Sequence, residues 1–259
     1  MMSHEEVRYE VVDRVARITL DRPPVNALSL EFIQNVVAAF RRAAADDAAR
    51  AVVLCSALTV RFSAGLDLDI LIGKPLADIR PFLQELYIGL YDAQYDLGKP
   101  SIAAVGGAAR GGGITMSISC DVILAAERAT FGYSEIDIGV LPAIHFAHLP
   151  RIIGRHRAFE VLFSGRVFTA REAADLGIVS RVVADAELDQ AAMDLARTFA
   201  TKSGSVMKQG RAAFMRQNDL DYRRSIAAAV EDFCNIAVSD DAQEGLRAFL
   251  EKRQPTWND

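Results

Sequence analysis

The length, composition and charge of the chain exclude several classes of protein. The sequence has 259 residues, 51% hydrophobic and 24% charged, which is ordinary globular usage and suits one large domain or a domain with a small appendage. A net charge of -5 is not the basic footprint of a nucleic-acid-binding protein. No apolar run reaches the ~18 residues of a membrane helix, and the polar opening segment is unlike a signal peptide. We therefore expect a cytoplasmic protein without nucleic-acid or membrane partners.

The cysteines point to the same compartment. Cys55, Cys120 and Cys234 are odd in number, far apart and in no C-x-x-C pair, so we expect free thiols in a reducing environment. His145 and His148 could share one helix face, but the sequence offers no further ligands beside them. We expect no metal site.

The first half of the chain alternates strand and helix signals. Residues 15–20 alternate apolar and polar positions, as a half-buried strand does. Ser29 is expected to cap a helix that extends to Arg41, and a long helix is expected to fill much of 77–97. Wholly apolar runs predict strands that are covered on both faces at 51–55, 101–105 and 121–125.

Helix signals dominate from about Ala143 onward. The expected C-terminal helices are 186–201, 206–217, 222–238 and 242–251. This order predicts an α/β core over residues 1–195, followed by an α-helical part over 196–259. The boundary is soft, because no linker or repeat marks it, and the two parts can pack as one unit.

Two glycine-bearing segments, 61–68 and 104–113, carry most of the functional information. In the second, a buried strand ends at Val105 and a helix-like run begins at Ile114. Glycines at a helix N-terminus expose backbone N–H donors to an anion, such as a phosphate or a transient oxyanion. The spacing fits neither the dinucleotide fingerprint G-x-G-x-x-G nor the phosphate loop G-x-x-x-x-G-K-[ST], which disfavours a nucleotide-binding protein. A tight strand-to-helix turn without a ligand is the alternative.

The two segments together resemble the oxyanion-hole segments of the crotonase (enoyl-CoA hydratase/isomerase) family, in which F-[SCA]-A-G-x-D-[LI] precedes A-V-x-G-x-x-x-G-G-G by about forty residues. The resemblance continues through 21–28, 131–135, 139–142, 149–154, 163–166, 170–179 and 244–253. It implies an α/β fold with a ββα spiral core and a C-terminal α-helical part. It also implies an acyl-CoA thioester substrate, no cofactor other than the coenzyme A of that substrate, and a homotrimer or homohexamer.

The resemblance also implies roles for individual residues. It places the two oxyanion donors on the backbone N–H groups of Leu66 and Gly112. One such donor is worth about 3 kcal/mol of barrier when a proton leaves the carbon next to a thioester carbonyl. Ala27, Leu28 and Ala64 match positions that contact coenzyme A, together with the two donors.

Glu135 matches the catalytic carboxylate of the family. A partly apolar pocket would raise its pKa and suit proton transfer near neutral pH; a solvent-facing glutamate is the alternative. Hydratases of the family carry a second glutamate two residues past the glycine triplet, where this chain has Thr115. Because double-bond migration needs only one carboxylate, the sequence favours an isomerase.

Other functions stay open at this stage. His145 is a possible second acid/base or, with Thr115, a possible water site, and either would allow an enoyl-CoA hydratase with one glutamate. A non-catalytic acyl-CoA-binding subunit is a further alternative. We expect Asp67 to orient the first glycine loop, Asp137 to be a surface carboxylate, and residues 70–95 to shape a pocket for an apolar or cyclic acyl group.

Overall fold

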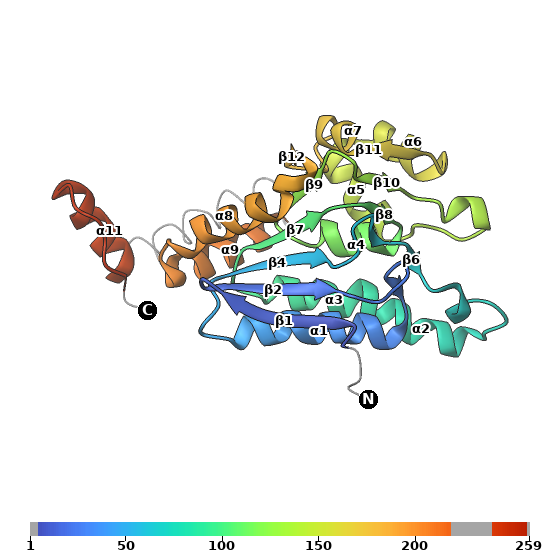
Figure 1. Ribbon diagram of the computed structural model, residues 1–259, viewed down its shortest axis with the longest axis horizontal. Helices are drawn as coiled ribbons and strands as arrows, with labels where there is room; N and C mark the ends of the chain where they lie inside the picture. The colour runs from blue at the N-terminus through green and yellow to red at the C-terminus, as the bar shows by residue number, and fades with distance from the viewer. Residues whose placement is uncertain (1–4, 219–239, 258–259) are drawn as a thin grey trace.

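The computed structural model describes residues 5–218 and 240–257, and its largest sheet has six strands (Figure 1). Their order is β1-β2-β4-β7-β9-β12. The bounds are β1 Val7–Val12, β2 Val15–Leu20, β4 Ala51–Ser56, β7 Ser101–Val105, β9 Val122–Ala126 and β12 Arg181–Val183. β1 and β2 form an antiparallel hairpin, and all the other neighbours are parallel. The strand predictions at 15–20, 51–55, 101–105 and 121–125 are confirmed to within one residue.

Helices cover both faces of this sheet. α1 (Leu30–Ala45) packs against β1 and β2, and α8 (Leu188–Ala200) packs against β4, β7 and β9 on the other face. β4 and β7 are buried almost throughout because neither face meets water. Each large apolar side chain fully buried in these layers contributes about 1.5–3 kcal/mol. Ser29 caps α1 as expected, accepting a hydrogen bond from the Phe32 N–H at 3.1 Å.

Short strands follow the long ones and build the spiral. β5 (Arg61–Ser63) follows β4, β8 (Ala108–Arg110) follows β7, and β10 (Thr130–Gly132) follows β9. These three and β11 (Val167–Thr169) form a second sheet in the order β11-β10-β8-β5. A third, two-stranded sheet pairs β3 (Ala27–Leu28) with β6 (Gly65–Leu66). The repeated long and short strands with their helices are the expected ββα spiral.

The connecting helices are short. They are η1 Leu68–Ile70, α2 Leu76–Gln84, η2 Glu85–Gly89, α3 Leu90–Tyr95, α4 Gly112–Ile118, η3 Ile136–Ile138, α5 His145–Ile153, α6 Arg155–Phe163, α7 Ala170–Asp175 and η4 Asp185–Glu187. The expected helix at 77–97 is present as α2 and α3, joined by η2, a π-helical turn. α4 begins inside the glycine triplet, two residues earlier than predicted.

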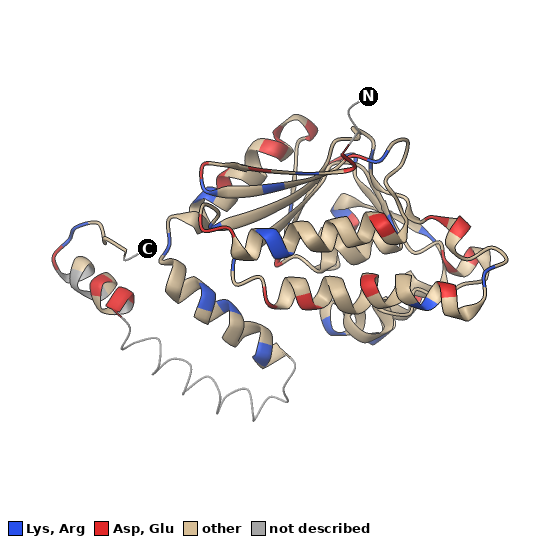
Figure 2. Cartoon of the chain, turned by 90° about the horizontal axis from the view of Figure 1, so that it is seen from below, with Lys and Arg blue, Asp and Glu red and all other residues tan. Residues whose placement is uncertain are grey.

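The C-terminal part is helical, as expected. α9 (Gly204–Asn218) and α11 (Asp240–Leu250) follow α8, whereas the helix expected at 222–238 lies outside the described residues. The predicted boundary at residue 195 falls within α8, which packs on the sheet. All the charged residues of α9 are basic (Figure 2). Few strands are predicted from the sequence after Ala143, and β11 and β12 are not among them. Each has only three residues, which leave little pattern to detect.

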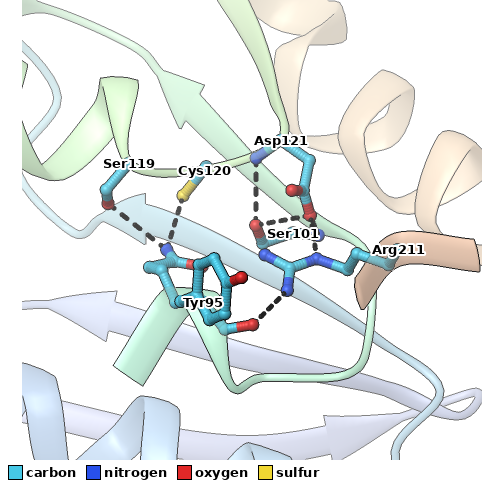
Figure 3. A network of polar contacts seen from close by, with 7 residues as sticks. Tyr95, Ser101, Ser119, Cys120, Asp121 and Arg211 are labelled. Atoms are coloured by element: carbon cyan, nitrogen blue, oxygen red, sulfur yellow. Dashed lines mark hydrogen bonds and ion pairs between the residues drawn. The ribbon is translucent and has the colours of Figure 1, made fainter. Parts of the chain in front are cut away.

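A partly buried polar network fastens α9 to the sheet (Figure 3). The Arg211 Nε donates to an Asp121 carboxylate oxygen at 2.9 Å, and its Nη1 donates to the Tyr95 carbonyl at 3.1 Å. The same Asp121 oxygen accepts from the N–H and the hydroxyl of Ser101. Because the Arg211 side chain is 5% exposed and the Asp121 side chain is 23% exposed, this ion pair is partly shielded from water and salt.

The remaining expectations concern thiols, membranes and metals. Cys55 and Cys120 are free and buried, as predicted, and Cys234 lies outside the described residues. Among the helices that the structure describes, none is long and apolar enough to cross a membrane. Within residues 5–218 and 240–257, no group of three or more His, Cys, Asp or Glu side chains could hold a metal ion.

Candidate active site

The first glycine segment presents a backbone N–H group at the end of the small sheets. β6 pairs with β3 in parallel, with Gly65 opposite Ala27 and Leu66 opposite Leu28. The N–H of Asp67 donates to the Leu28 carbonyl at 3.1 Å. Since N–H groups of successive strand residues point in opposite directions, the N–H of Leu66 points away from β3.

The second glycine segment brings another donor beside it. Gly112 is the first residue of α4, so its N–H has no partner within the helix. A Cβ atom built on Gly65 would lie 3.5 Å from the Gly112 nitrogen and 2.8 Å from the Arg110 carbonyl oxygen. This close approach requires a residue without a side chain. The two predicted donors, on Leu66 and Gly112, therefore lie on neighbouring backbones.

Glu135 stands against the same turn. A Cβ atom added to Gly111 would overlap its carboxylate, and the φ of +43° at Gly111 is one that residues with a side chain rarely adopt. The Glu135 Oε2 is buried and has no hydrogen-bond partner among the described residues. Burial raises the pKa of this carboxyl group, because desolvation disfavours its charged form. The site thus holds a carboxylate that is more basic than one in water.

These groups share one small cavity of about 60 Å³. Ala64, Leu66, Gly111 and Glu135 are among its lining residues, and Gly112 follows directly in the chain. Leu28 is not in the lining: its side chain is buried, with a methyl group 2.7 Å from a Cβ built on Gly112. Leu28 therefore supports the donor from behind, while Ala64 is exposed at the cavity. Ala27 lies beside Leu28 in β3 and is also outside the lining.

Thr115 and His145 meet each other behind the glycine turn. The Thr115 Oγ1 and the His145 Nε2 are 3.1 Å apart, and His145 is 1% exposed. Burial, and then the neighbouring His148, hold the pKa of His145 well below 6.5. A neutral imidazole is a hydrogen-bond partner at neutral pH and not a proton donor of the imidazolium type. The Thr115 N–H donates to the Gly111 carbonyl, which ties the pair to the turn beside Glu135.

Two acidic residues near the site differ in what they do: Asp67 holds a loop, and Asp137 lies at the surface. Asp67 caps η1 by accepting from the Asp69 N–H at 3.4 Å, and it pairs with Arg22 at 3.2 Å, so its orienting role in the loop is confirmed. Asp137 is an exposed carboxylate, also as expected. It shares no strand face with Glu135, because β10 ends at Gly132 and both residues lie in the turn around η3.

Two residues of the site were not singled out from the sequence. Gly111 is the residue against which the Glu135 carboxylate rests, and only its place in the glycine run could have indicated this. Tyr133 is fully buried, and its ring meets the His145 ring edge-on at 4.5 Å. Tyr133 lies two residues before Glu135, but an aromatic residue in such a segment is also typical of any core.

Comparisons with known proteins identify the family and the fold of the chain. The family described as Enoyl-CoA hydratase/isomerase matches residues 10–259. A Rhizobium meliloti protein named "Probable enoyl-CoA hydratase" is 34% identical, with 98% of each chain covered, and a Bacillus subtilis protein of the same name is 32% identical over 94% of this chain and 95% of its own. A crystal structure of an enoyl-CoA hydratase from Geobacillus kaustophilus superposes with a TM-score of 0.93 at 28% identity, covering 99% of this chain and 98% of its own. The chain therefore belongs to the enoyl-CoA hydratase/isomerase family: it is an acyl-CoA enzyme with the crotonase fold.

Proposed function

We propose that the enzyme is an enoyl-CoA isomerase in which Glu135 is the single acid/base. The observation that carries the proposal is the position of the partly buried Glu135 carboxylate, which lies against Gly111, the residue before Gly112 in the chain, in the cavity that Leu66 also lines. At the position where hydratases of the family have a second glutamate, the chain has Thr115. One carboxylate and two donors are sufficient for moving a double bond.

The proposed reaction starts from a 3-enoyl thioester. The Glu135 carboxylate removes a proton from C2, and the electron pair of that C–H bond moves into the conjugated enolate. The N–H groups of Leu66 and Gly112 stabilise the negative charge on the thioester oxygen. Protonated Glu135 then returns the proton to C4, and the double bond lies between C2 and C3. Each donor contributes about 3 kcal/mol, and a positioned acid/base typically adds about 10²–10⁴-fold.

The proposed chemistry assigns coenzyme A to the substrate and needs no other cofactor. The exposed Ala64 and the loop of Ala27 and Leu28 remain our candidates for contact with coenzyme A. We also propose a homotrimer or homohexamer. The exposed Phe159 and Phe163, whose rings stack at 4.4 Å, form the kind of apolar surface that a subunit contact covers. Light scattering at working concentration tests the assembly.

A specific observation favours hydration as the second candidate. The hydroxyl of Thr115 is held by the neutral His145 at 3.1 Å, so it can orient a water molecule although it is a poor base. In that reaction Glu135 would take a proton from the water, whose oxygen attacks C3 of a 2-enoyl thioester. Protonated Glu135 would then return this proton to C2 of the enolate, whose oxygen the N–H groups of Leu66 and Gly112 stabilise.

The experiment compares wild type, Glu135→Gln and Thr115→Val on 2-enoyl- and 3-enoyl-CoA, with migration and hydration measured separately. The isomerase proposal expects migration that falls about 10²–10⁴-fold in Glu135→Gln and is nearly unchanged in Thr115→Val. If hydration is the main activity and is lost in both Glu135→Gln and Thr115→Val, the hydratase proposal would replace the isomerase proposal. Migration that persists in a folded Glu135→Gln would refute the role of Glu135.

A further inference from the structure

A second cavity, of about 150 Å³, lies next to the proposed site. Three of its lining residues connect it to the catalytic turn. Leu86 reaches within 3.4 Å of a Cβ built on Gly112. Tyr87 is close enough to Glu135 for the negative charge to help burial raise the pKa of the phenol. Thr115 donates its N–H to the residue just before Gly112. The whole cavity is named the chamber. Its near end is therefore beside the oxyanion donors.

The chamber extends away from this turn along three helical segments. Its lining residues recur at helical spacing: Leu86, Leu90 and Gln94 in η2 and α3, Thr115 in α4 and Ser119 just after it, and Ile144, His148 and Ile152 in and just before α5. Each turn adds about 5.4 Å along a helix. The far end is formed by Gln94, by Ile152 and by Met215 of α9.

The chemistry of the wall suits an apolar tail. Most of the lining is aliphatic or aromatic, and burial holds the pKa of His148 at about 4, so its imidazole is neutral. The Gln94 amide nitrogen donates to the Ser119 hydroxyl and to the Cys120 sulfur, each at 3.3 Å. These bonds join Gln94 to the network of Figure 3. The ion pair of that network fixes α9, and with it Met215 at the chamber's end.

The volume of the chamber limits what it can hold. At about 30 Å³ for a group the size of a water molecule or methylene, 150 Å³ accommodates about five groups, which are C2 to C6 of the acyl chain when the thioester carbonyl lies at the oxyanion donors. We propose that the chamber receives the acyl chain and restricts the enzyme to short-chain enoyl thioesters, with Ile152 and Met215 as the specificity-determining residues. This inference rests on the proposed function of the neighbouring site.

Ile152 and Met215 make a thin far wall. Ile152 is 42% exposed and Met215 is partly buried, so truncating either side chain opens the chamber toward the surface with little expected loss of core packing. Ile152 lies about two helical turns from His145 in α5, and α9, which carries Met215, holds none of the proposed catalytic groups. A change in either should therefore alter which chain length is accepted and leave the proton transfer itself intact.

The test measures kcat/KM of wild type on four-, six-, eight- and twelve-carbon 2-enoyl- and 3-enoyl-CoA. We expect activity on the four- and six-carbon esters and a fall of about tenfold or more at eight carbons, since one methylene without a place costs about 10–200-fold. Ile152→Ala and Met215→Ala should each bring the eight-carbon ester to within about threefold of the six-carbon ester. Val12→Ala, at a β1 position that is 41% exposed and outside the lining of the chamber, is the matched control and should keep the wild-type profile.

Binding of saturated acyl-CoA esters to Glu135→Gln separates this inference from the proposed function. Suppose that the affinity of Glu135→Gln for acyl-CoA falls beyond six carbons and that wild type turns over no enoyl-CoA. This pair of results would support the role of the chamber and overturn the proposed reaction. Wild-type turnover with equal kcat/KM for all chain lengths would overturn the chamber and leave the reaction standing. A profile that neither Ile152→Ala nor Met215→Ala changes would refute the role of these two residues.

Discussion

A methyl group at Gly111 should disable the site and leave the fold largely intact. In Gly111→Ala the new Cβ would overlap an oxygen of Glu135 and lie 2.7 Å from its carboxyl carbon. The carboxylate has to move by about 1 Å to restore contact distances, and a misplacement of that size can cost about 10²-fold in rate. We expect kcat on the best enoyl-CoA substrate to fall by at least this factor, while the affinity for coenzyme A esters changes little.

The variant also carries a backbone penalty, which a matched control can measure. Gly111 has a φ of +43°, and an alanine in such a conformation costs on the order of 1–3 kcal/mol. Gly177 has a φ of +87° with nothing within 4 Å of a built Cβ, so Gly177→Ala introduces the strain without the overlap. Urea unfolding should show a loss of stability in both variants, and only Gly111→Ala should lose kcat. A folded Gly111→Ala with the kcat of Gly177→Ala would refute the proposed contact between turn and carboxylate.

Three further predictions concern stability. His148 is neutral in the fold, with a pKa of about 4 against 6.5 when unfolded; the unfolded chain therefore binds more protons between these values, and the free energy of unfolding should fall by up to about 3 kcal/mol as pH drops from 6.5 to 4. Urea titrations should show a shallower fall in His148→Asn, and equal slopes would contradict this. Arg211→Met leaves the partly exposed Asp121 carboxylate without its cation and should cost about 1.5–3 kcal/mol, the range for a hydrogen bond to a charged group, part of which a second change, Asp121→Asn, recovers; a loss that the double variant does not reduce would argue against the ion pair. Ser29→Ala should cost about 1 kcal/mol, seen as a Tm lower by a few degrees, and an unchanged Tm would show that the cap is dispensable.

The long strands were predictable because burial leaves a clear trace in composition. Residues 51–55 and 101–105 are apolar at nearly every position, and both became central parallel strands covered on both faces. β8 and β10 have only three residues each and include alanine or glycine. Their pairing depends on the spiral that brings distant segments together, so local sequence holds little of it.

The helix over 76–95 illustrates a second limit. Its helical character was predicted, but the π-helical turn at Glu85–Gly89 was not. Such turns add a residue to one helical turn and often occur at functional sites. Here the turn carries Leu86 and Tyr87, which both line the chamber. Because no sequence period marks a single π-helical turn, only the three-dimensional packing shows which side chains it turns inward.

Some features of the site could also be predicted from the sequence, and others could not. Glu135, Leu66 and Gly112 were named from motifs, and the structure places them around one turn, although their catalytic roles stay predictions. The contact between Thr115 and His145, thirty residues apart, could be anticipated only as a shared pocket. His145 is 1% exposed, and burial holds its pKa well below 6.5, which favours a hydrogen-bonding role over acid/base catalysis.

The orientation of Arg110 explains why Glu135 can stay basic beside a cation. Arg110 lines the same cavity, and an arginine paired with the carboxylate would lower its pKa. The guanidinium instead donates to the carbonyls of Ala109 and Thr130 at 3.0 and 2.9 Å, and to the Thr130 hydroxyl at 3.0 Å. These bonds turn the charge toward β10 and away from the carboxylate, so burial is the main influence on the pKa of Glu135 and raises it. The segment from Arg110 to Gly112 thus directs a neutral N–H donor to the site, while the Arg110 guanidinium points away from it. A carboxylate base beside a developing enolate needs this arrangement.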